Sequence, residues 1–486
     1  MSNFASAVRW DLLPYINGDG LDVGCGDARP HDWIVGIDIA PGTTSRGPNH
    51  LRDARKLAGY FADESQDYVF SSYCLNELED WPTVLAGWWR LIKPNGYLIL
   101  FLPVQGLEGP QPPEMKPSGP KLVVDAMAGL KPWQLVDARV NDNAFFQVYR
   151  KCEGERPEQP DPEKICAVMK LGAHGDAMWA SSVFPHLKDQ GYYTLLYCQE
   201  TTEEVLRHDP HIDRIIQFSS KVPMGELGEL FHWLETKYKN CRLLIECVEG
   251  TLLPSPQKIN YHFPQAMRHK TMDFNYLEMH HMKAEVPHIP MQKFYPNKDE
   301  MKWANALRLE LRPHLVVLVP SGSSVTKMWP HAPELARYLL RREDVTVVVM
   351  GDLRDLKFED HPRLMKVGTS WPMRQCMTLA QLASVVVGQE TGLLNCVAHE
   401  ETVRKVVLMT HSSVENLTRD WPNTASMVGE TDCGPCHRLH YNWEYCTQDM
   451  WTKAAACQSK IGVMDVLREI EIAIPEGVIA LEEKAA

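Results

Sequence analysis

The sequence predicts an α/β protein that contains three doubly wound modules, each with a mostly parallel sheet. Two observations predict this fold class. Short apolar runs typical of buried strands alternate with amphipathic, helix-type segments along most of the 486 residues. Small-residue turns directly follow apolar runs near residues 23, 171 and 320. Turns of this kind allow the backbone to approach a ligand at the carboxyl edge of a parallel sheet.

The charge balance limits the range of partners. Lys plus Arg number 50 and Asp plus Glu number 63, a net charge of −13, which disfavours a general binder of nucleic acid or anionic membranes. No run of 18 apolar residues and no signal-peptide pattern occurs, so we expect a cytoplasmic protein without a membrane span. Peripheral membrane contact and oligomeric state are left open.

Residues 1–152 form the first predicted module. LDVGCGDARP at residues 21–30 joins a strand to a glycine turn, and IVGIDIA closes the next strand on Asp38, at the spacing of a ribose-binding carboxylate. Residues 88–103 contain a helix end, a Lys-Pro-Asn-Gly turn and a strand, and residues 136–151 suit an antiparallel strand pair. Together these segments resemble a class I S-adenosylmethionine-dependent methyltransferase with a Rossmann-like fold.

That resemblance implies a cofactor site. Asp22, Gly24 and Gly26 would line the methionine end of S-adenosylmethionine, Asp38 would take the ribose hydroxyls, and Asp53 would lie near the adenine. Ala28 replaces the third glycine of the family, and Asn76-Glu77 stands where many relatives carry His-Glu. The insertion at residues 106–120 is short for a substrate lid. The methyl acceptor is left open, and a non-catalytic domain that binds the cofactor or docks its neighbour is the alternative.

A charged, proline-rich linker is predicted at residues 153–163. In residues 164–310, strands and helices alternate again, as in a parallel sheet with right-handed crossovers. ICAVMKLGAHGDAMWASSVFPHL, from residue 165, predicts a strand, a turn between Gly172 and Gly175, and a helix over residues 176–190 that opens with Asp176.

Residues 311–460 contain the third predicted module. A buried strand at 315–320 leads into a small-residue turn and then Lys-Met-Trp-Pro, which begins at Lys327. A second strand, at 385–388, ends in Gln-Glu-Thr-Gly-Leu before another helix. With the Asp176 turn, these motifs resemble glycosyltransferase family 9, the heptosyltransferase-like enzymes, in which two Rossmann-like halves form a GT-B module. Glu390 replaces the usual aspartate and Asn395 the usual histidine.

The family 9 resemblance implies inverting transfer of a sugar. Asp176 would be the general base, although a carboxylate at this place is also a common helix N-cap. A heptose-like donor activated with ADP would be held at its diphosphate, and a glycan would be the acceptor. The expected donor-binding residues are Ser321, Gly322, Ser323, Lys327, Glu390, Thr391, Gly392 and Leu393. A lysine at a helix entry is otherwise commonly just solvated.

Four late cysteines form a separate pattern. Cys433 and Cys436 make a C-x₂-C pair, and Cys446 and Cys457 follow. Their spacing suits a structural zinc site with four thiolate ligands. In an alternative ligand set, His437 or His440 replaces one of the sulfurs. A disulfide and free thiols are the alternatives. His280, His281 and His288 lack the surrounding pattern of a metal site, so we read them as ordinary histidines.

The complete sequence therefore predicts a bifunctional glycan-modifying enzyme, with a methyltransferase-like domain ahead of a glycosyltransferase module. Residues 461–486 are expected to hold a closing helix that packs back across the first half of that module, followed by a tail. Two alternatives stand. Either the methyltransferase is the working enzyme and the second part a binding module, or both parts are non-catalytic interaction domains.

Overall fold

The computed structural model describes residues 4–104, 119–130, 132–141, 143–152, 161–246, 263–354, 356–438 and 442–475. Most of the expected linker, most of the 106–120 insertion, His440 and most of the tail lie outside these residues. The chain divides into two compact units, residues 1–163 with 216–243 and residues 164–215 with 244–486. Residues 216–243, which the sequence placed within the second module, thus group with the first unit.

The first unit contains a seven-stranded sheet in the order β3-β2-β1-β4-β5-β7-β6. The first five strands along the chain pair in parallel. The last two form the predicted antiparallel pair, because β7 runs antiparallel to both β5 and β6. The strands are β1 Gly20–Val23, β2 Val35–Asp38, β3 His50–Leu51, β4 Gln66–Ser72, β5 Ile92–Pro103, β6 Gln134–Val140 and β7 Ala144–Arg150. The α-helices are α1 Arg9–Leu12, α2 Trp81–Leu91, α3 Pro120–Met127 and α7 Met224–Lys237.

Two further sheets follow; β8 and β9 pair in parallel in the first, and all strands pair in parallel in the second. A four-stranded sheet has the order β10-β9-β8-β11, and a six-stranded sheet has the order β14-β13-β12-β15-β16-β17. The first comprises β8 Ile165–Lys170, β9 Tyr193–Cys198, β10 Arg214–Gln217 and β11 Arg242–Glu246. The second comprises β12 His314–Val319, β13 Val345–Met350, β14 Leu364–Gly368, β15 Val385–Gln389, β16 Arg404–Met409 and β17 Thr424–Val428. Together with the first sheet, these orders confirm the predicted α/β fold class.

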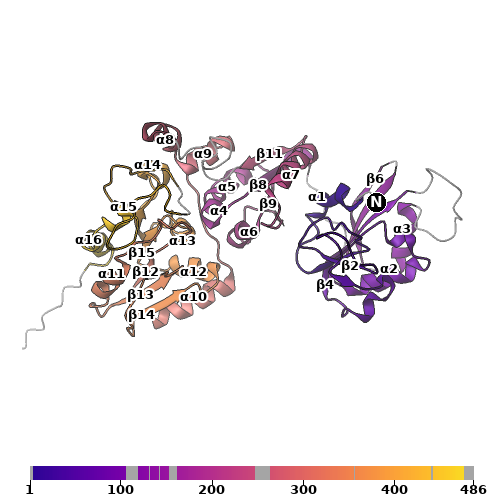
Figure 1. Cartoon of the computed structure of the whole chain (residues 1–486), viewed down its shortest axis with the longest axis horizontal. Helices are drawn as coiled ribbons and strands as arrows, with labels where there is room; N and C mark the ends of the chain where they lie inside the picture. Colours follow the sequence, from indigo (N-terminus) through magenta and orange to yellow (C-terminus); the bar gives the residue numbers. More distant parts are fainter. Residues whose placement is uncertain are drawn as a thin grey trace, which may run out of the picture. The chain divides into compact units, whose positions relative to one another are not determined.

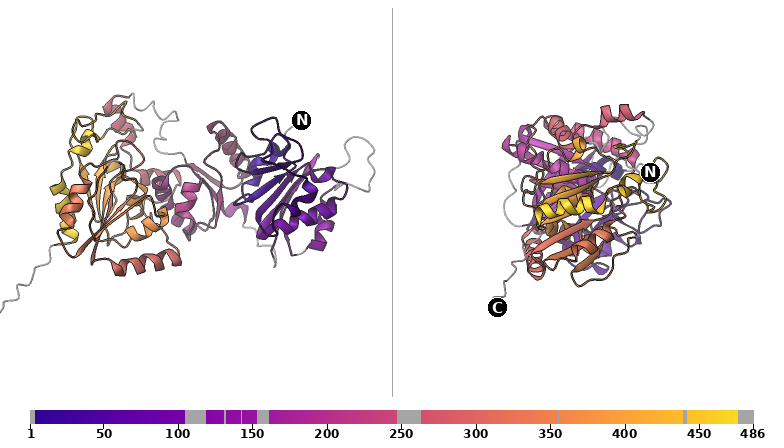
Figure 2. Two further views of the ribbon diagram at one scale, coloured as in Figure 1. Left: turned by 60° about the horizontal axis from the view of Figure 1, so that its bottom comes forward. Right: turned by 90° about the vertical axis from the view of Figure 1, so that its left-hand side faces the viewer.

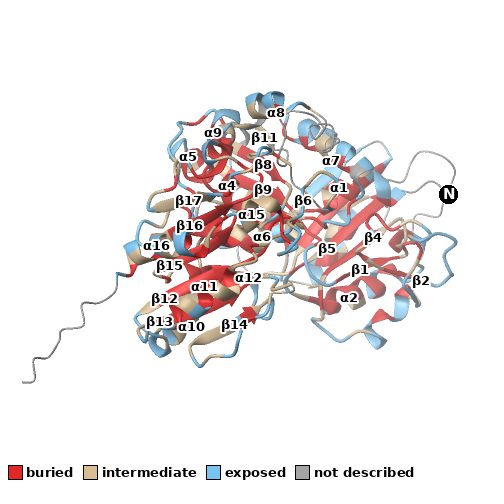
Figure 3. Ribbon diagram, turned by 60° about the vertical axis from the view of Figure 1, so that its left-hand side comes forward, coloured by how far each residue is buried: buried red, intermediate tan, exposed pale blue. Residues whose placement is uncertain are grey.

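Helices cover both faces of the six-stranded sheet (Figure 1). Alternate residues of β12 point to opposite faces: Leu315 and Val317 join a core with α12 and α13, whereas Val316 and Leu318 join a core with α11 and α16. Burial on both sides explains why the strand is a continuous apolar run. Figure 3 shows the strands buried and the outward faces of the helices exposed.

The helices of the second unit are short. They are α4 His174–Ser181, α5 Phe184–Asp189, α6 Glu200–Leu206, α8 Gln265–Met272, α9 Tyr276–Lys283, α10 Lys298–Glu310, α11 Ala332–Leu339, α12 Met373–Ala380, α13 Gly392–Cys396, α14 Val414–Leu417, α15 Ala456–Ser459 and α16 Val463–Ala473.

Two sequence predictions about helices are wrong. The single helix expected over residues 176–190 is split into α4 and α5, because Pro185 cannot donate a backbone hydrogen bond and so starts a new helix. The closing helix α16 does not pack across the first half of its unit. Its apolar residues Val463, Val466 and Ile470 lie in the core of the six-stranded sheet, and Figure 2 (right) shows the yellow helix over the orange strands.

Candidate functional site

In the first unit, the loops after β1 and β4 meet where the strand order reverses. Gly24 and Gly26 follow β1 with φ of +74° and +55°, a left-handed backbone that favours glycine. A Cβ placed at Gly24 would lie 2.2 Å from the Cβ of Cys74 in the loop after β4, whereas one placed at Gly26 would meet nothing within 4 Å. This edge between β1 and β4 is where a doubly wound sheet binds a ligand.

Asp22 is the unusual group at this edge. Its side chain is completely buried, and neither carboxyl oxygen has a hydrogen-bond partner among the described residues. Burial raises the pKa of Asp22 to about 8, with a further increase from the charge of Asp38 and an opposing effect of Arg29. Burying a carboxyl group without hydrogen-bond partners lowers the stability of the fold. A cationic ligand would supply the interaction that the protein does not.

Asp38 and Asp53 have different surroundings. The Asp38 carboxylate accepts hydrogen bonds from the backbone N–H of Gly26 at 2.9 Å and of Ala40 at 3.2 Å, so it is held beside the glycine turn. The Asp53 carboxylate accepts from the Arg55 backbone at 3.0 Å and from its guanidinium at 2.7 Å. The Arg55 hydrogen bonds lower the pKa of Asp53 to about 2.

The residues present fit S-adenosylmethionine, which carries an ammonium and a sulfonium. Asp22 offers a buried negative group without a partner among the described residues, and Asp38 lies next to the turn at Gly26. Asp53 already holds Arg55 and begins a 3-10 turn. The predicted adenine contact of Asp53 stays a prediction.

In the second unit, the predicted donor residues lie at the corresponding edge of the six-stranded sheet. The loop that begins at Ser321 follows β12 and the segment that begins at Glu390 follows β15, and strands β12 and β15 are neighbours at the point where the strand order reverses. A Cβ at Gly322 would lie 2.9 Å from Lys327 Cδ and 3.1 Å from Thr391 Cγ2. The two loops therefore touch, as the sequence motifs predict for a ligand-binding edge.

Lys327 is held by the second of these loops. Its ammonium donates a hydrogen bond of 2.8 Å to the backbone oxygen of Glu390 and lies 3.8 Å from the Glu390 carboxylate. The Lys327 side chain is 9% exposed. It is therefore a fixed cation, which differs from the solvated lysine of the alternative reading.

The Glu390 carboxylate is already occupied by protein groups. It accepts from the backbone and hydroxyl of Thr410 at 2.7 and 2.9 Å and from those of Ser412 at 3.3 and 3.2 Å, and it lies 2.9 Å from His411 Nδ1. Burial by itself would raise its pKa, but the charge and hydrogen bond of His411 and the charge of Lys327 hold that pKa well below its ordinary value. Glu390 is thus a buried counter-ion.

Sequence reasoning missed His411 and Arg354 at this edge. Arg354 follows β13, and its guanidinium donates to the backbone oxygens of Ser324 at 2.8 Å and Val325 at 3.3 Å, and also to that of Gly322. Both residues follow strands of the same sheet, which was the available signal. In the turn itself, the Ser321 hydroxyl donates to the Asp352 backbone oxygen, whereas Ser323 is exposed.

Thr391, Gly392 and Leu393 begin the five-residue helix α13. Thr391 is its N-cap with extended backbone. Leu393 is buried in the apolar core of the unit, so its side chain fixes the helix and only its backbone lies at the turn.

Asp176 lies in the first turn of α4, after β8. Asp176 is not the N-cap that the alternative expects: Ala173 is the N-cap of α4, and Asp176 Oδ2 accepts a hydrogen bond of 3.1 Å from the Ala173 backbone N–H. Gly172, with φ of +118°, is packed against it, because a Cβ there would lie 3.0 Å from Asp176 Cβ. Capping uses one carboxylate oxygen in this contact and is compatible with a second role.

The Asp176 turn directly contacts the α13 turn. A Cβ placed at Gly392 would lie 2.6 Å from His174 Cβ, and one at Gly175 would lie 3.9 Å from the Gly392 nitrogen. Lys327 contacts the same segment at Glu390. The turn that contains Asp176 and the Lys327 side chain, which follow strands of different sheets, thus both contact one segment, residues 390–392.

The four late cysteines do not confirm the zinc prediction. None of them forms a disulfide, and no group of three or more His, Cys, Asp or Glu among the described residues could hold a metal ion. Burial, and then the charges of Cys433, Cys457 and Cys446, raise the pKa of Cys436 to about 12. His437 Nε2 lies 2.8 Å from the Asp273 carboxylate. The thiols are near enough to affect one another electrostatically.

Comparison with known proteins supports the N-terminal prediction. Residues 21–100 match the family model described as "Methyltransferase domain". The chain is 34% identical over 101 residues to a malonyl-[acyl-carrier protein] O-methyltransferase of Xylella fastidiosa (strain M23), a match that covers 17% of this chain and 34% of that protein. The chain thus spans about a third of the length of this curated relative.

Solved structures resemble the larger part of the chain. A glycosyl transferase family 9 protein from Veillonella parvula DSM 2008 is 12% identical with a TM-score of 0.47, and the match covers 66% of this chain and 99% of that one. The ADP-heptose lps heptosyltransferase II of E. coli is 16% identical with a TM-score of 0.44, covering 64% of this chain and 98% of that one. No helix among the described residues is long and apolar enough to cross a membrane.

Proposed function

We propose that the second unit transfers a sugar, with inversion, from a nucleoside diphosphate donor to a glycan acceptor. The observation that carries this proposal is that the turn containing Asp176 and the Lys327 ammonium both contact residues 390–392. A carboxylate and a fixed ammonium at the same edge are the two groups that a metal-independent displacement at an anomeric carbon requires.

Each group has a separate role in the proposed step. The acceptor oxygen attacks the anomeric carbon, its proton passes to the Asp176 carboxylate, and the bond from that carbon to the diphosphate oxygen breaks. The electron pair of the broken bond leaves on the diphosphate. The Lys327 ammonium and the backbone N–H of Gly392 stabilise that growing charge.

Glu390 is assigned a positioning role in this scheme. Its oxygens are filled by Thr410, His411 and Ser412, so it is a poor ligand for sugar or ribose hydroxyls. It instead orients Lys327. An ADP-activated, heptose-like sugar is the donor that the sequence motifs favour, and the protein is proposed to act in the cytoplasm without a nucleic-acid partner.

For the first unit, we propose S-adenosylmethionine-dependent methyl transfer. The buried, unpartnered carboxyl group of Asp22 supports this proposal, together with the Gly24 and Gly26 turn and the placement of Asp38. The bound cofactor would supply an electrophilic methyl group. Asp22 would neutralise its positive charge and Asp38 would orient its ribose.

The variant Asp176→Asn tests whether Asp176 acts as a general base or only stabilises the start of its helix. Turnover of a panel of ADP-, GDP- and UDP-sugars, with water as acceptor, is measured as release of the nucleoside diphosphate. Asp176→Asn keeps an oxygen that accepts from the Ala173 N–H but cannot take a proton, so we expect kcat to fall by roughly 10²–10⁴. Stability should fall by no more than about 1 kcal/mol, because the Asn oxygen still accepts from the Ala173 N–H and only a negative charge in the first turn of the helix is lost.

The result that contradicts the proposal is an Asp176→Asn variant as active as the wild type. Turnover of no donor by the wild type would also contradict it. Methyl transfer by such a preparation would then favour the reading in which the first unit is the working enzyme.

A further inference from the structure

Asn395 is the hub of a buried hydrogen-bond set between the two sheets of the second unit. Its side-chain oxygen accepts from Trp179 Nε1 at 2.7 Å, and its side-chain nitrogen donates to the Thr391 backbone oxygen at 2.9 Å. Gln292 Nε2 donates to the Asn395 backbone oxygen. Trp179, Gln292 and Asn395 are all at least nine-tenths buried, and the Trp179 N–H and the Asn395 amide are already paired with each other and with the Thr391 backbone.

The hub connects the first turns of two helices that carry proposed functional groups. Trp179 lies three residues after Asp176 on α4, and Asn395 lies three residues after Gly392 on α13. Residues three apart share one face of a helix. The Trp179–Asn395 bond therefore fixes the Asp176 turn relative to the turn that meets Lys327.

Two glycines make this contact close. At Gly392 a Cβ would come within 2.6 Å of His174 Cβ, and at Gly175 it would lie 3.4 Å from the side-chain nitrogen of Asn395. A larger residue at Gly392 would push the two turns apart. The small residues and the buried polar hub thus specify one separation between the turns.

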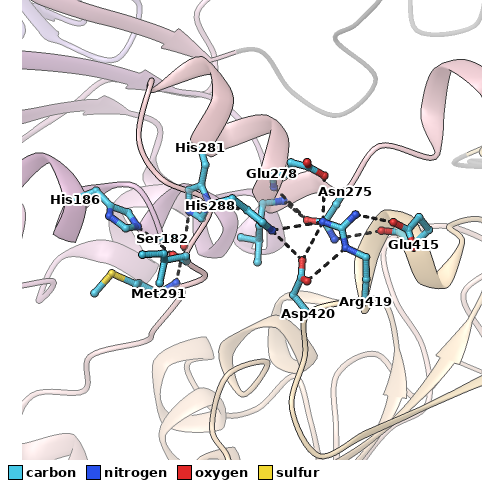
Figure 4. Close-up of polar contacts among 12 residues, drawn as sticks. Ser182, His186, Asn275, Glu278, His281, His288, Met291, Glu415, Arg419 and Asp420 are labelled. Carbon is cyan, nitrogen blue, oxygen red and sulfur yellow. Dashed lines mark hydrogen bonds and ion pairs between the residues drawn. The ribbon is translucent and has the colours of Figure 1, made fainter.

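A second contact set joins the same parts of the unit farther from Asp176 (Figure 4). Ser182 Oγ lies 2.8 Å from His281 Nε2, the Nδ1 atoms of His281 and His288 lie 3.0 Å apart, and His288 Nε2 lies 3.3 Å from Asp420. Arg419 also lies 3.1 Å from Glu278. These histidines are thus occupied within the protein, and this set stabilises the junction without including Asp176 or α13.

We infer that Trp179, Asn395 and Gln292 are positioning residues that set the distance between the Asp176 carboxylate and the donor-binding turn. The inference rests on the proposed function. It also explains Asn395, which stands where the family motif has histidine: its polar atoms hold the two turns together. The donor is bound by other groups, so loss of the hub should lower the rate of the chemical step and leave donor affinity nearly unchanged.

The chain offers a matched pair of tryptophans for the test. Trp179→Phe removes the N–H that Asn395 accepts and keeps most of the ring. Trp421→Phe makes the same change at a tryptophan of the same core that is 5% exposed, and whose Nε1 has no acceptor among the described residues. We expect Trp179→Phe to lower kcat for ADP-heptose turnover about tenfold with KM changed less than threefold, and Trp421→Phe to stay within twofold of wild type.

A double variant tests whether the two groups act as one. Asn395→Leu should lower kcat to a similar extent, and Trp179→Phe/Asn395→Leu should be no slower than the slower single variant. Hydrogen exchange should show faster exchange in both α4 and α13 for Trp179→Phe, which establishes that the protein is folded and that the junction is loosened.

Equal kcat for Trp179→Phe and Trp421→Phe would overturn the inference while the proposed function stands. Multiplying effects in the double variant, or a loss confined to KM, would overturn it as well. Wild-type protein that turns over no nucleotide sugar would overturn the proposed function and with it this inference, and that result is recognised before any variant is made.

Discussion

Asp22 and Glu390 are buried carboxyl groups beside the switch points of two different sheets, and their surroundings are opposite. Asp22 lies one residue before the end of β1, beside the switch point of its sheet, and has no hydrogen-bond partner among the described residues. Glu390 follows β15 at the switch point of the six-stranded sheet and has Thr410, His411, Ser412 and Lys327 around it. Burial raises the pKa of Asp22 to about 8, whereas the neighbours of Glu390 hold its pKa well below the ordinary value.

This difference separates a binding group from a structural one. A carboxyl group whose partners are all protein atoms contributes to the fold and to the orientation of those partners. One that is buried without partners costs stability until a ligand provides them. Similar placement in the chain thus gives different roles, and the partners decide which.

The largest expected effect is that of Glu390→Gln. The substitution leaves Lys327 and His411 buried without their counter-ion, so we expect the free energy of unfolding to fall by about 3–5 kcal/mol. Denaturant-dependent hydrogen exchange of the β15 and β16 amides measures it. Glu359→Gln, at a carboxylate 76% exposed and 3.9 Å from Arg337, is the matched control and should change stability by less than about 0.5 kcal/mol.

The pH dependence checks the sign of the Glu390 effect. The pKa of Glu390 is lower in the folded state than its ordinary value of 4.5, so its contribution is complete above pH 4.5 and is lost as the pH falls below that value. The difference between wild type and Glu390→Gln should therefore shrink in acid. A difference that is constant with pH would indicate that the carboxylate charge is not what stabilises this site.

Asp22→Asn should act in the opposite direction on the protein without cofactor. As the pH rises from the ordinary pKa of 3.8 toward about 8, the unfolded state loses its proton first and the wild type loses stability. The variant lacks this loss, so at pH 8 it should be more stable than the wild type by about 1–3 kcal/mol. Affinity for S-adenosylmethionine should fall by roughly tenfold, about 1.4 kcal/mol.

Thermal unfolding at pH 4 and pH 8 and titration calorimetry with S-adenosylmethionine measure these two effects of Asp22→Asn. Unchanged cofactor affinity would contradict the contrast between Asp22 and Glu390, because Asp22 would then not bind the cofactor. Equal gains in stability at both pH values would exclude ionisation as the cause.

Asp53→Asn should have the smallest effect and sharpens the comparison. The Asp53 carboxylate is 21% exposed and is paired with Arg55, and Asn is as good a cap as Asp. We expect stability to change by less than about 0.5 kcal/mol and the dissociation constant for S-adenosylmethionine, measured by calorimetry, by less than threefold. A large loss of affinity would place this carboxylate in the cofactor site after all.

The strands and their turns could be predicted because the signals are local. The apolar runs of β8, β12 and β15 and the glycines that follow them lie within a few residues of each other, and the resulting sheets confirm the fold class. The break between α4 and α5 is also a local signal, because Pro185 lies in the first turn of α5. The sequence prediction of one continuous helix did not take this proline into account.

The surroundings of the candidate site could not be predicted in the same way. Glu390 was expected to bind the donor, and the partners that its carboxylate has in the structure lie about twenty residues later in the chain. Asn395 was identified only as the replacement of a histidine in the family motif, and its partner Trp179 lies 216 residues earlier. The closing helix α16 has the apolar stripe that its sequence indicates. The stripe alone does not specify which of several apolar faces of the protein the helix covers.

By itself, then, the sequence determined where strands end, where the backbone must turn on glycine, and which residue types stand at those turns, because backbone sterics and side-chain periodicity act over a few residues. Only the tertiary structure decided which of those polar groups are satisfied by the protein and which are not. Partnership and burial depend on residues far apart in the chain, and they separate Asp22 from Glu390 and give Asn395 its place between two helices.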